Sequence, residues 1–208
     1  MRDPYLYPDS DVLMNKLNIR NQSEVDKAEA DFVVFRLKEV AQNPLPGDYN
    51  YAHLMRMHET LFQDLYIWAG EERLINMYKE EPVLGGLSID YSDFRNIKND
   101  GIKALRAMKM KNWREISVEN AARELAASLA EIWKIHPFRE GNTRTVITFC
   151  CQFADEQGWT IDRSLFEQNS QYVRTALVAY NAVFKYGSFK ENETDRLIAE
   201  KSPFMRER

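Results

Sequence analysis

Apolar side chains recur every three or four positions along most of this 208-residue chain. This spacing places them on one face of an α-helix, and it predicts an all-α fold. Three long stretches carry the apolar sets Val25, Ala28, Phe32, Phe35; Leu54, His58, Leu61, Leu65, Trp68; and Val118, Ala122, Leu125, Leu129, Ile132. Shorter helical stretches are expected around 12–17, 94–108, 145–153, 165–184 and 194–198. Ser23 and Ser117 precede two of the long stretches and are predicted N-caps.

One segment, residues 76–91, departs from the helical pattern. Two short apolar stretches, Val83-Leu84 and Leu87-Ser88-Ile89, flank Gly85-Gly86. A Gly-Gly pair between such stretches is typical of a two-residue hairpin turn. We therefore expect a small β-hairpin between the helices.

Length and charge restrict the classes of function. The size of the chain fits one ordinary domain, and no internal repeat or linker marks a boundary. A net charge of -4 provides no overall positive field to attract nucleic acid or an anionic membrane, and we expect neither partner. Its two cysteines, Cys150 and Cys151, are adjacent, which is a poor geometry for a structural disulfide. We expect a cytoplasmic protein, with export as an effector by a non-classical route as the alternative.

Unusual residue types are concentrated in one segment, residues 135–145, between two helical stretches. Pro137 disfavours helical backbone at His136, so the preceding helix should end there with its imidazole projecting. Gly141 allows a tight turn, and Asn142 is a favourable N-cap for the next helix. The free N–H groups of that second helix would point back into the same loop.

The chemistry of this loop suggests phosphoryl or nucleotidyl transfer. A helix N-terminus binds anions, and Arg144 in its first turn adds a planar donor for phosphate oxygens. Glu140 suits Mg²⁺, which binds through one or two carboxylates plus substrate phosphates. His136 has the residue type of a general base at neutral pH. A histidine at a helix end and a Gly-Asn turn also occur separately in inert loops, so it is their combination that is informative.

At this loop the sequence resembles the Fic family, whose signature is His-x-Phe-x-Asp/Glu-Gly-Asn-Gly-Arg-x-x-Arg. The corresponding segment here runs from His136 to Ile147. Residues 61–71 and 7–13 are also similar to stretches of that family, so the resemblance covers about 5–186. It implies a single Fic domain over 1–208, with a helical bundle, a hairpin flap beside the loop (the flap, residues 76–91) and a helical tail at 187–208.

The resemblance also implies an activity and site roles. Most Fic proteins transfer AMP from ATP to a Tyr, Thr or Ser hydroxyl of a target protein. His136 would be the base, Phe138 the buried anchor of the loop and Glu140 the Mg²⁺ ligand. The implied nucleotide-binding residues are Arg139, Glu140, Gly141, Asn142, Thr143, Arg144 and Tyr172, and the implied target-binding residues of the flap are Lys79, Leu84 and Gly85.

Two departures from the signature keep alternatives open. Thr143 replaces the second glycine and Ile147 replaces the final arginine. The alternatives are a Doc-like kinase that uses the same histidine, and a catalytically weak protein that binds nucleotide or a partner. The Ser/Thr-x-x-x-Glu inhibitory motif of the family is absent from this sequence. Either a small antitoxin-like protein supplies it in trans, or this inhibition is not used; Ile147 favours the second, because the inhibitory glutamate would lack its cation.

Overall fold

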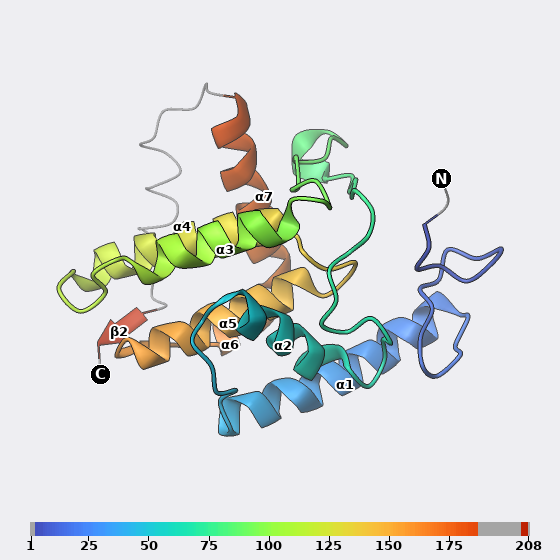
Figure 1. Cartoon of the computed structure of the whole chain (residues 1–208), viewed down its shortest axis with the longest axis horizontal. Coiled ribbons are helices and arrows are strands. Elements are labelled where there is room, and N and C mark those ends of the chain that lie inside the picture. Colours follow the sequence, from blue (N-terminus) through green and yellow to red (C-terminus); the bar gives the residue numbers. More distant parts are fainter. Residues whose placement is uncertain (1–2, 187–204, 208) are drawn as a thin grey trace.

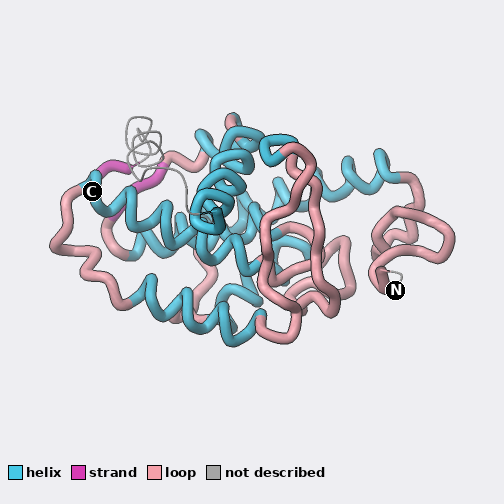
Figure 2. The backbone as a smooth tube through the Cα atoms, turned by 90° about the horizontal axis from the view of Figure 1, so that it is seen from above, coloured by secondary structure: helices cyan, strands magenta, loops and turns pink. Residues whose placement is uncertain are grey.

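The computed structural model describes residues 3–186 and 205–207, and helices account for most of this backbone (Figures 1 and 2). The helices are α1 (Gln22–Gln42), α2 (Tyr51–Phe62), the 3₁₀ helix η1 (Pro82–Leu84), α3 (Ile97–Lys109), α4 (Val118–Ile135), α5 (Asn142–Glu156), α6 (Ser164–Gln168) and α7 (Ser170–Tyr186). Two short strands, β1 (Trp159–Ile161) and β2 (Met205–Glu207), pair antiparallel. The predicted all-α class is confirmed.

Helix α5 lies at the centre of the bundle. It packs against α2 on one side and α4 on another, while α1 covers α2 and α3 runs alongside α4 (Figure 1). Val146, Phe149 and Cys150 of α5 are fully buried in the core that these helices share. Both cysteines are free, as their adjacency predicted, and both are buried. Because α5 is buried between its neighbours, the loop that begins it is held in a fixed place.

The predicted helices agree with the structure in position but differ in detail. Ser117 caps α4 as predicted, but α1 begins two residues earlier than expected, because the Asn21 side chain accepts a hydrogen bond from the Glu24 N–H. The buried face of α1 carries Val25, Val33 and Val40, and the predicted core residue Phe35 is 59% exposed.

No helix forms at 12–17, contrary to prediction. The Asn15 side chain binds backbone groups of Leu13 and Ile19, and Leu6 pairs with Leu13 in an isolated bridge. Such side-chain bonds to the backbone compete with helix formation. The apolar residue Val12 is nevertheless buried.

The C-terminal predictions are partly outside the described residues. The stretch 165–184 forms two helices, α6 and α7, which Asn169 separates. The expected helix at 194–198 and most of the helical tail at 187–208 lie outside the described residues. Within that tail, β2 is a strand, and it pairs with β1.

The flap folds back at the predicted glycines, but its arms form no strands. Gly85 and Gly86 both have positive φ angles, of 64° and 90°, as a tight turn requires. Pro82 begins η1 instead of a strand, because its fixed φ suits a helical turn and it has no N–H to donate. Two backbone bonds link residues on either side of the turn, from the Glu81 N–H to the Leu87 oxygen at 3.2 Å and from the Leu87 N–H to the Leu84 oxygen at 3.3 Å, and no other backbone bond joins the two arms among the described residues. The prediction of a β-hairpin was therefore wrong.

No helix of residues 3–186 has both the length and the apolar character that a membrane span needs.

Candidate active site

Helix α4 ends where the sequence predicted. His136 follows its last residue and has left-handed backbone, with φ 52° and ψ 58°. This conformation is uncommon for a residue other than glycine, and it turns the chain out of the helix axis. The His136 N–H still bonds to the Trp133 oxygen at 3.1 Å.

The imidazole of His136 does not project freely, contrary to prediction. It is 1% exposed, and neither of its ring nitrogens has a hydrogen-bond partner among the described residues. The Tyr91 ring, at the end of the flap, lies 4.2 Å from it between centroids. Burial, with the nearby cations of Lys79 and Arg73, holds the pKa of His136 well below its usual range. The ring is therefore neutral and has a free acceptor nitrogen.

Phe138 anchors the loop in the core, as predicted. It is fully buried, and its ring stacks on the His58 ring with 3.7 Å between centroids and an interplanar angle of 8°. His58 Nδ1 accepts a hydrogen bond from the Gly70 N–H, so Nε2 donates to the Glu140 backbone oxygen at 3.1 Å. Burial lowers the pKa of His58 to about 3. This neutral histidine fixes the loop backbone on both sides of Arg139.

Asn142 has a different local role from the one predicted. It is the first residue of α5, and the N-cap is Gly141, with φ 80°. The Asn142 amide makes two hydrogen bonds with the Phe138 backbone, at 2.9 and 2.7 Å, and so closes the loop. A Cβ at Gly141 would lie 2.3 Å from the Phe62 ring. The loop therefore requires glycine at this position for both its φ angle and its space.

The first turn of α5 has the donors of an anion site. An α-helix leaves its first N–H groups without intrahelical acceptors, and here these belong to Asn142, Thr143 and Arg144. The Thr143 hydroxyl accepts a hydrogen bond from Trp133 Nε1 at 2.9 Å. This threonine therefore ties α5 to the last turn of α4.

Arg144 is oriented by a carboxylate from α1. The Glu29 side chain contacts the Arg144 guanidinium at 2.5 Å and accepts a hydrogen bond from the Tyr66 hydroxyl, also at 2.5 Å. Glu140 lies 3.8 Å from the same guanidinium. The guanidinium also lies over the Phe62 ring, 4.9 Å from its centroid. These contacts fix the guanidinium of the predicted phosphate ligand.

Glu140 fits the predicted magnesium role. Burial alone would raise its pKa, but the Lys79 cation and the Gly141 N–H outweigh it, and the pKa of this carboxyl stays below its usual range. One carboxylate oxygen already faces a cation, since Lys79 Nζ lies 3.6 Å away. The described residues contain no cluster of three or more metal-ligating side chains. Any Mg²⁺ held by Glu140 would take its other ligands from phosphates and water.

The flap is joined to the rest of the molecule by two ion pairs. Lys79 contacts Glu140 in the loop, and Glu81 contacts Arg174 of α7 at 2.5 Å. The Glu81 side chain is almost completely buried. In Figure 1 the flap is the green loop next to α7. Together with Tyr91, these contacts hold the flap over the imidazole.

Several predicted site residues lie elsewhere. Arg139 contacts Asp3 near the N-terminus at 2.8 Å. Leu84 and Gly85 are at the tip of the flap, where a Cβ on Gly85 would meet open space. Tyr172 lies in the first turn of α7 and is 46% exposed, and its contact with a nucleobase stays a prediction.

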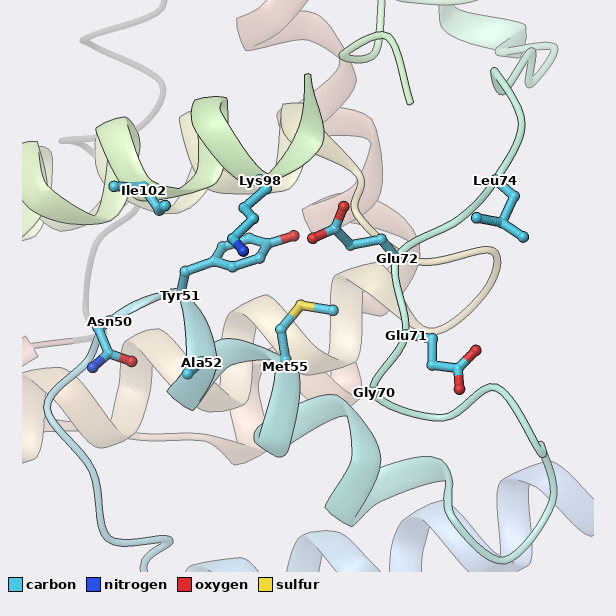
Figure 3. A pocket seen from close by; sticks show the side chains of 10 residues that line it. All are labelled: Asn50, Tyr51, Ala52, Met55, Gly70, Glu71, Glu72, Leu74, Lys98 and Ile102. Atoms are coloured by element: carbon cyan, nitrogen blue, oxygen red, sulfur yellow. The ribbon is translucent and has the colours of Figure 1, made fainter. Parts of the chain in front are cut away.

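A groove of about 770 Å³ lies apart from the loop, between the start of α2, α3 and the segment after Gly70 (Figure 3). The Tyr51 ring crosses it, with its hydroxyl directed toward the Glu72 carboxylate (Figure 3). None of its lining residues belongs to the 136–144 loop. They are Asn50, Tyr51, Ala52, Met55, Gly70, Glu71, Glu72, Leu74, Lys98 and Ile102.

The sequence reasoning missed the residues that support the loop. Glu29 and His58 fall within recognised helical stretches, but periodicity only indicates a helix face and does not identify the partner. Arg73 and Tyr91 come from irregular segments and reach the loop through long-range contacts. Glu29 would have been detectable as an acidic residue close to the apolar face of a predicted helix.

Comparison with known proteins supports the resemblance. The model of the Fic/DOC family matches residues 48–154. A probable protein adenylyltransferase, y4lH of Sinorhizobium fredii, is 34% identical over 80% of this chain and 83% of its own length. The protein adenylyltransferase VbhT of Bartonella schoenbuchensis is 27% identical over 86% of this chain. The matched region spans only 36% of the length of VbhT.

Solved structures share the fold. The BepC protein of Bartonella tribocorum, crystallised with bound AMPPNP, superposes with a TM-score of 0.78 and 21% identity, covering 98% of this chain and 97% of that one. An N-terminal Fic domain from Bartonella quintana with bound ADP gives a TM-score of 0.75 at 22% identity, covering 98% of this chain and 95% of that one. At this level of identity the likeness concerns the fold alone.

Proposed function

We propose a function on the premise that this chain belongs to the Fic/DOC family. The chain is a protein adenylyltransferase: it transfers AMP from ATP to a Tyr, Thr or Ser hydroxyl of a target protein. Two relatives, y4lH and VbhT, carry the name protein adenylyltransferase and support this proposal. One geometric observation supports it as well. A neutral imidazole ends one helix, and the anion-binding start of the next helix follows it within six residues.

His136 acts as the general base. Its free ring nitrogen accepts the proton of the target hydroxyl while that oxygen bonds to the α-phosphorus. The bond from the α-phosphorus to the bridging oxygen breaks, and diphosphate leaves. A triphosphate beside the ring raises the pKa of His136 from its low resting value, since a nearby opposite charge favours the protonated form.

The start of α5 and Arg144 hold the phosphates. The N–H groups of residues 142–144 and the helix dipole favour negative charge at this point. Arg144 adds charge-assisted hydrogen bonds, and Glu29 keeps its guanidinium in place. Glu140 would hold Mg²⁺, and the ion would neutralise phosphate charge. The protein contributes mainly position and charge, as in other phosphate-transfer enzymes.

The flap must move before the reaction. In the described arrangement Tyr91 covers the imidazole and Lys79 contacts the Glu140 carboxylate. Glu140 is the carboxylate that would hold Mg²⁺, so Lys79 would have to give up its contact with Glu140 for the metal to bind there. In this arrangement the imidazole is closed to a target hydroxyl.

Three other expectations remain part of the proposal. The whole chain acts as one Fic domain. A cytoplasmic site of action, where ATP is available, fits two free cysteines. The third expectation is that no antitoxin-like protein inhibits the chain in trans through the usual glutamate, because Ile147 offers that glutamate no cation.

Labelled ATP tests the activity. The chain is incubated with a protein extract and ATP labelled at either the α- or the γ-phosphate. We expect protein-bound label only from the α position, and none with His136→Ala. Retention from the γ position alone would assign a kinase reaction and defeat the proposal. Equal labelling by His136→Ala would show that the histidine is not the base.

A further inference from the structure

A buried arginine outside the signature loop contacts the backbone of the proposed base. Arg73 is 1% exposed and lies between α2 and the flap. Its Nε donates to the His136 carbonyl oxygen at 2.7 Å, and its Nη2 lies 3.4 Å from the Ile135 oxygen. Its own backbone N–H donates to the Pro137 oxygen at 2.8 Å. Arg73 thus contacts three consecutive residues at the end of α4.

The same side chain contacts both ends of the flap. Nη1 donates to the Ile75 oxygen just before it, and Nη2 donates to the Ser92 oxygen just after it. One guanidinium therefore joins the two ends of the flap to the backbone of the histidine that the flap covers. A planar group with five N–H donors in fixed directions can make this set of bonds, and a lysine ammonium cannot.

The Arg73 guanidinium makes no close ion pair, although the Asp93 carboxylate lies near enough to favour its charge. None of the ion pairs among the described residues includes it. Its neighbours are the carbonyl oxygens at the C-terminus of α4, which carry the negative end of the helix dipole and lack intrahelical donors. A buried cation without a close ion pair is unfavourable unless its donors are satisfied, and here carbonyl oxygens satisfy them. The C-terminus of α4 is therefore stabilised by the Arg73 cation, whereas many helices end in a glycine cap.

We propose that Arg73 is a positioning residue for His136: it holds the left-handed backbone of the base and fixes the flap in register with it. This inference rests on the proposed role of His136 as the base. Arg73 touches neither nucleotide nor target, and it acts only through the His136 backbone. The nucleotide phosphates are held separately, by Arg144 and the start of α5.

The test compares Arg73→Lys with a matched control, Tyr5→Phe. The Tyr5 hydroxyl accepts a hydrogen bond from the Leu74 N–H, so its loss perturbs the same segment without touching His136. For Arg73→Lys we expect kcat to fall by about 100-fold, as for an ångström-scale misplacement of a reacting group, with the Kd for ATP changed less than threefold. Tyr5→Phe should keep both constants near those of the unsubstituted chain.

Nuclear magnetic resonance of the His136 ring gives a readout independent of activity. In Arg73→Lys the Cε1 signal of His136 should shift and begin to titrate at higher pH, while the His58 signal stays unchanged. Unchanged kcat and His136 signals would overturn the proposal, as would equal losses of kcat and ATP affinity. If the unsubstituted chain transfers no AMP but the His136 signal still shifts in Arg73→Lys, the proposed function is wrong and the positioning of His136 by Arg73 stands.

Two further measurements test the proposal if Arg73→Lys does not fold. Arg73→Gln is neutral and keeps two N–H donors, and we expect the same change in the His136 signal. In the unsubstituted protein, scalar coupling across the hydrogen bond should link Arg73 Nε to the His136 carbonyl carbon. Absence of that coupling would overturn the proposal without any variant.

Discussion

The Glu29 carboxylate of α1 lies 2.5 Å from the Arg144 guanidinium in the first turn of α5, 115 residues further along the chain. The Tyr66 hydroxyl donates to the second oxygen of the same carboxylate. The proposed phosphate ligand is thus held by a helix that carries none of the signature. The proposed nucleotide site therefore depends on the packing of α1.

Replacing Glu29 by glutamine should weaken ATP binding. The charge-assisted bond to Arg144 is lost, and bonds of this class contribute roughly 1.5 to 3 kcal/mol. We expect the Kd for ATP to rise by about tenfold in calorimetric titration. Glu39→Gln is the matched control, since Glu39 is on the same helix and pairs with Arg36 at the surface. Equal effects of the two substitutions would show that Arg144 does not need Glu29.

Replacing Thr143 by alanine should destabilise the fold. The buried Trp133 Nε1–H would lose its acceptor, which costs roughly 1 to 3 kcal/mol. Urea unfolding should show this loss, and Thr143→Ser should retain most of the stability because it keeps the hydroxyl. An alanine variant as stable as the parent would mean that the indole finds another acceptor.

Stability should fall as the solution becomes acidic, because all three histidines of the chain are buried. Burial lowers the pKa of each of them in the folded state, and for His58 to about 3. The unfolded chain therefore binds protons below pH ~6.5, while the folded chain does not. The free energy of unfolding should drop by up to about 1.4 kcal/mol per pH unit between pH ~6 and ~4 on account of His58, and His53 and His136 should add to the drop in the same direction.

Urea titrations at a series of pH values measure this slope. His58→Gln should reduce the slope of the unfolding free energy against pH by the contribution of about one proton, because glutamine does not titrate. A free energy of unfolding that stays constant between pH 7 and 5 would contradict the burial of these rings.

The Glu81–Arg174 ion pair should hold the flap closed. In Glu81→Gln the pair loses its charge, and we expect the amides of residues 82–87 to exchange with solvent faster while α5 keeps its protection. Glu80→Gln is the control, since Glu80 is the exposed neighbour of Glu81. Hydrogen exchange with mass spectrometry resolves the flap from the helices. If Glu81→Gln and Glu80→Gln exchange alike, the ion pair does not control the flap.

The sequence predicted the helices and the loop because both depend on local rules. Apolar periodicity located the long helices, and Pro137 and Gly141 marked the end of one helix and the start of the next. The error at the flap was also local in origin, since Gly85-Gly86 signals a turn in a hairpin or after a 3₁₀ helix alike. Pro82 favours the 3₁₀ helix over the hairpin strand.

Contacts between distant segments could not be predicted in the same way. The Arg73–His136 bond spans 63 positions and the His58–Glu140 bond spans 82. No spacing rule links such residues, because the packing of α2, α4 and α5 brings them together. Asn142 shows the same limit at short range. Its residue type favours the N-cap position, but its side chain instead makes hydrogen bonds with the Phe138 backbone.

A crystal structure with Mg²⁺ and a non-hydrolysable ATP analogue tests the central claim most directly. We expect the phosphates against the N–H groups of residues 142–144 and the Arg144 guanidinium, the metal on Glu140, and Tyr91 displaced so that the His136 ring faces the α-phosphate. A nucleotide bound elsewhere, or a His136 ring still covered by Tyr91 with the loop filled, would contradict the account.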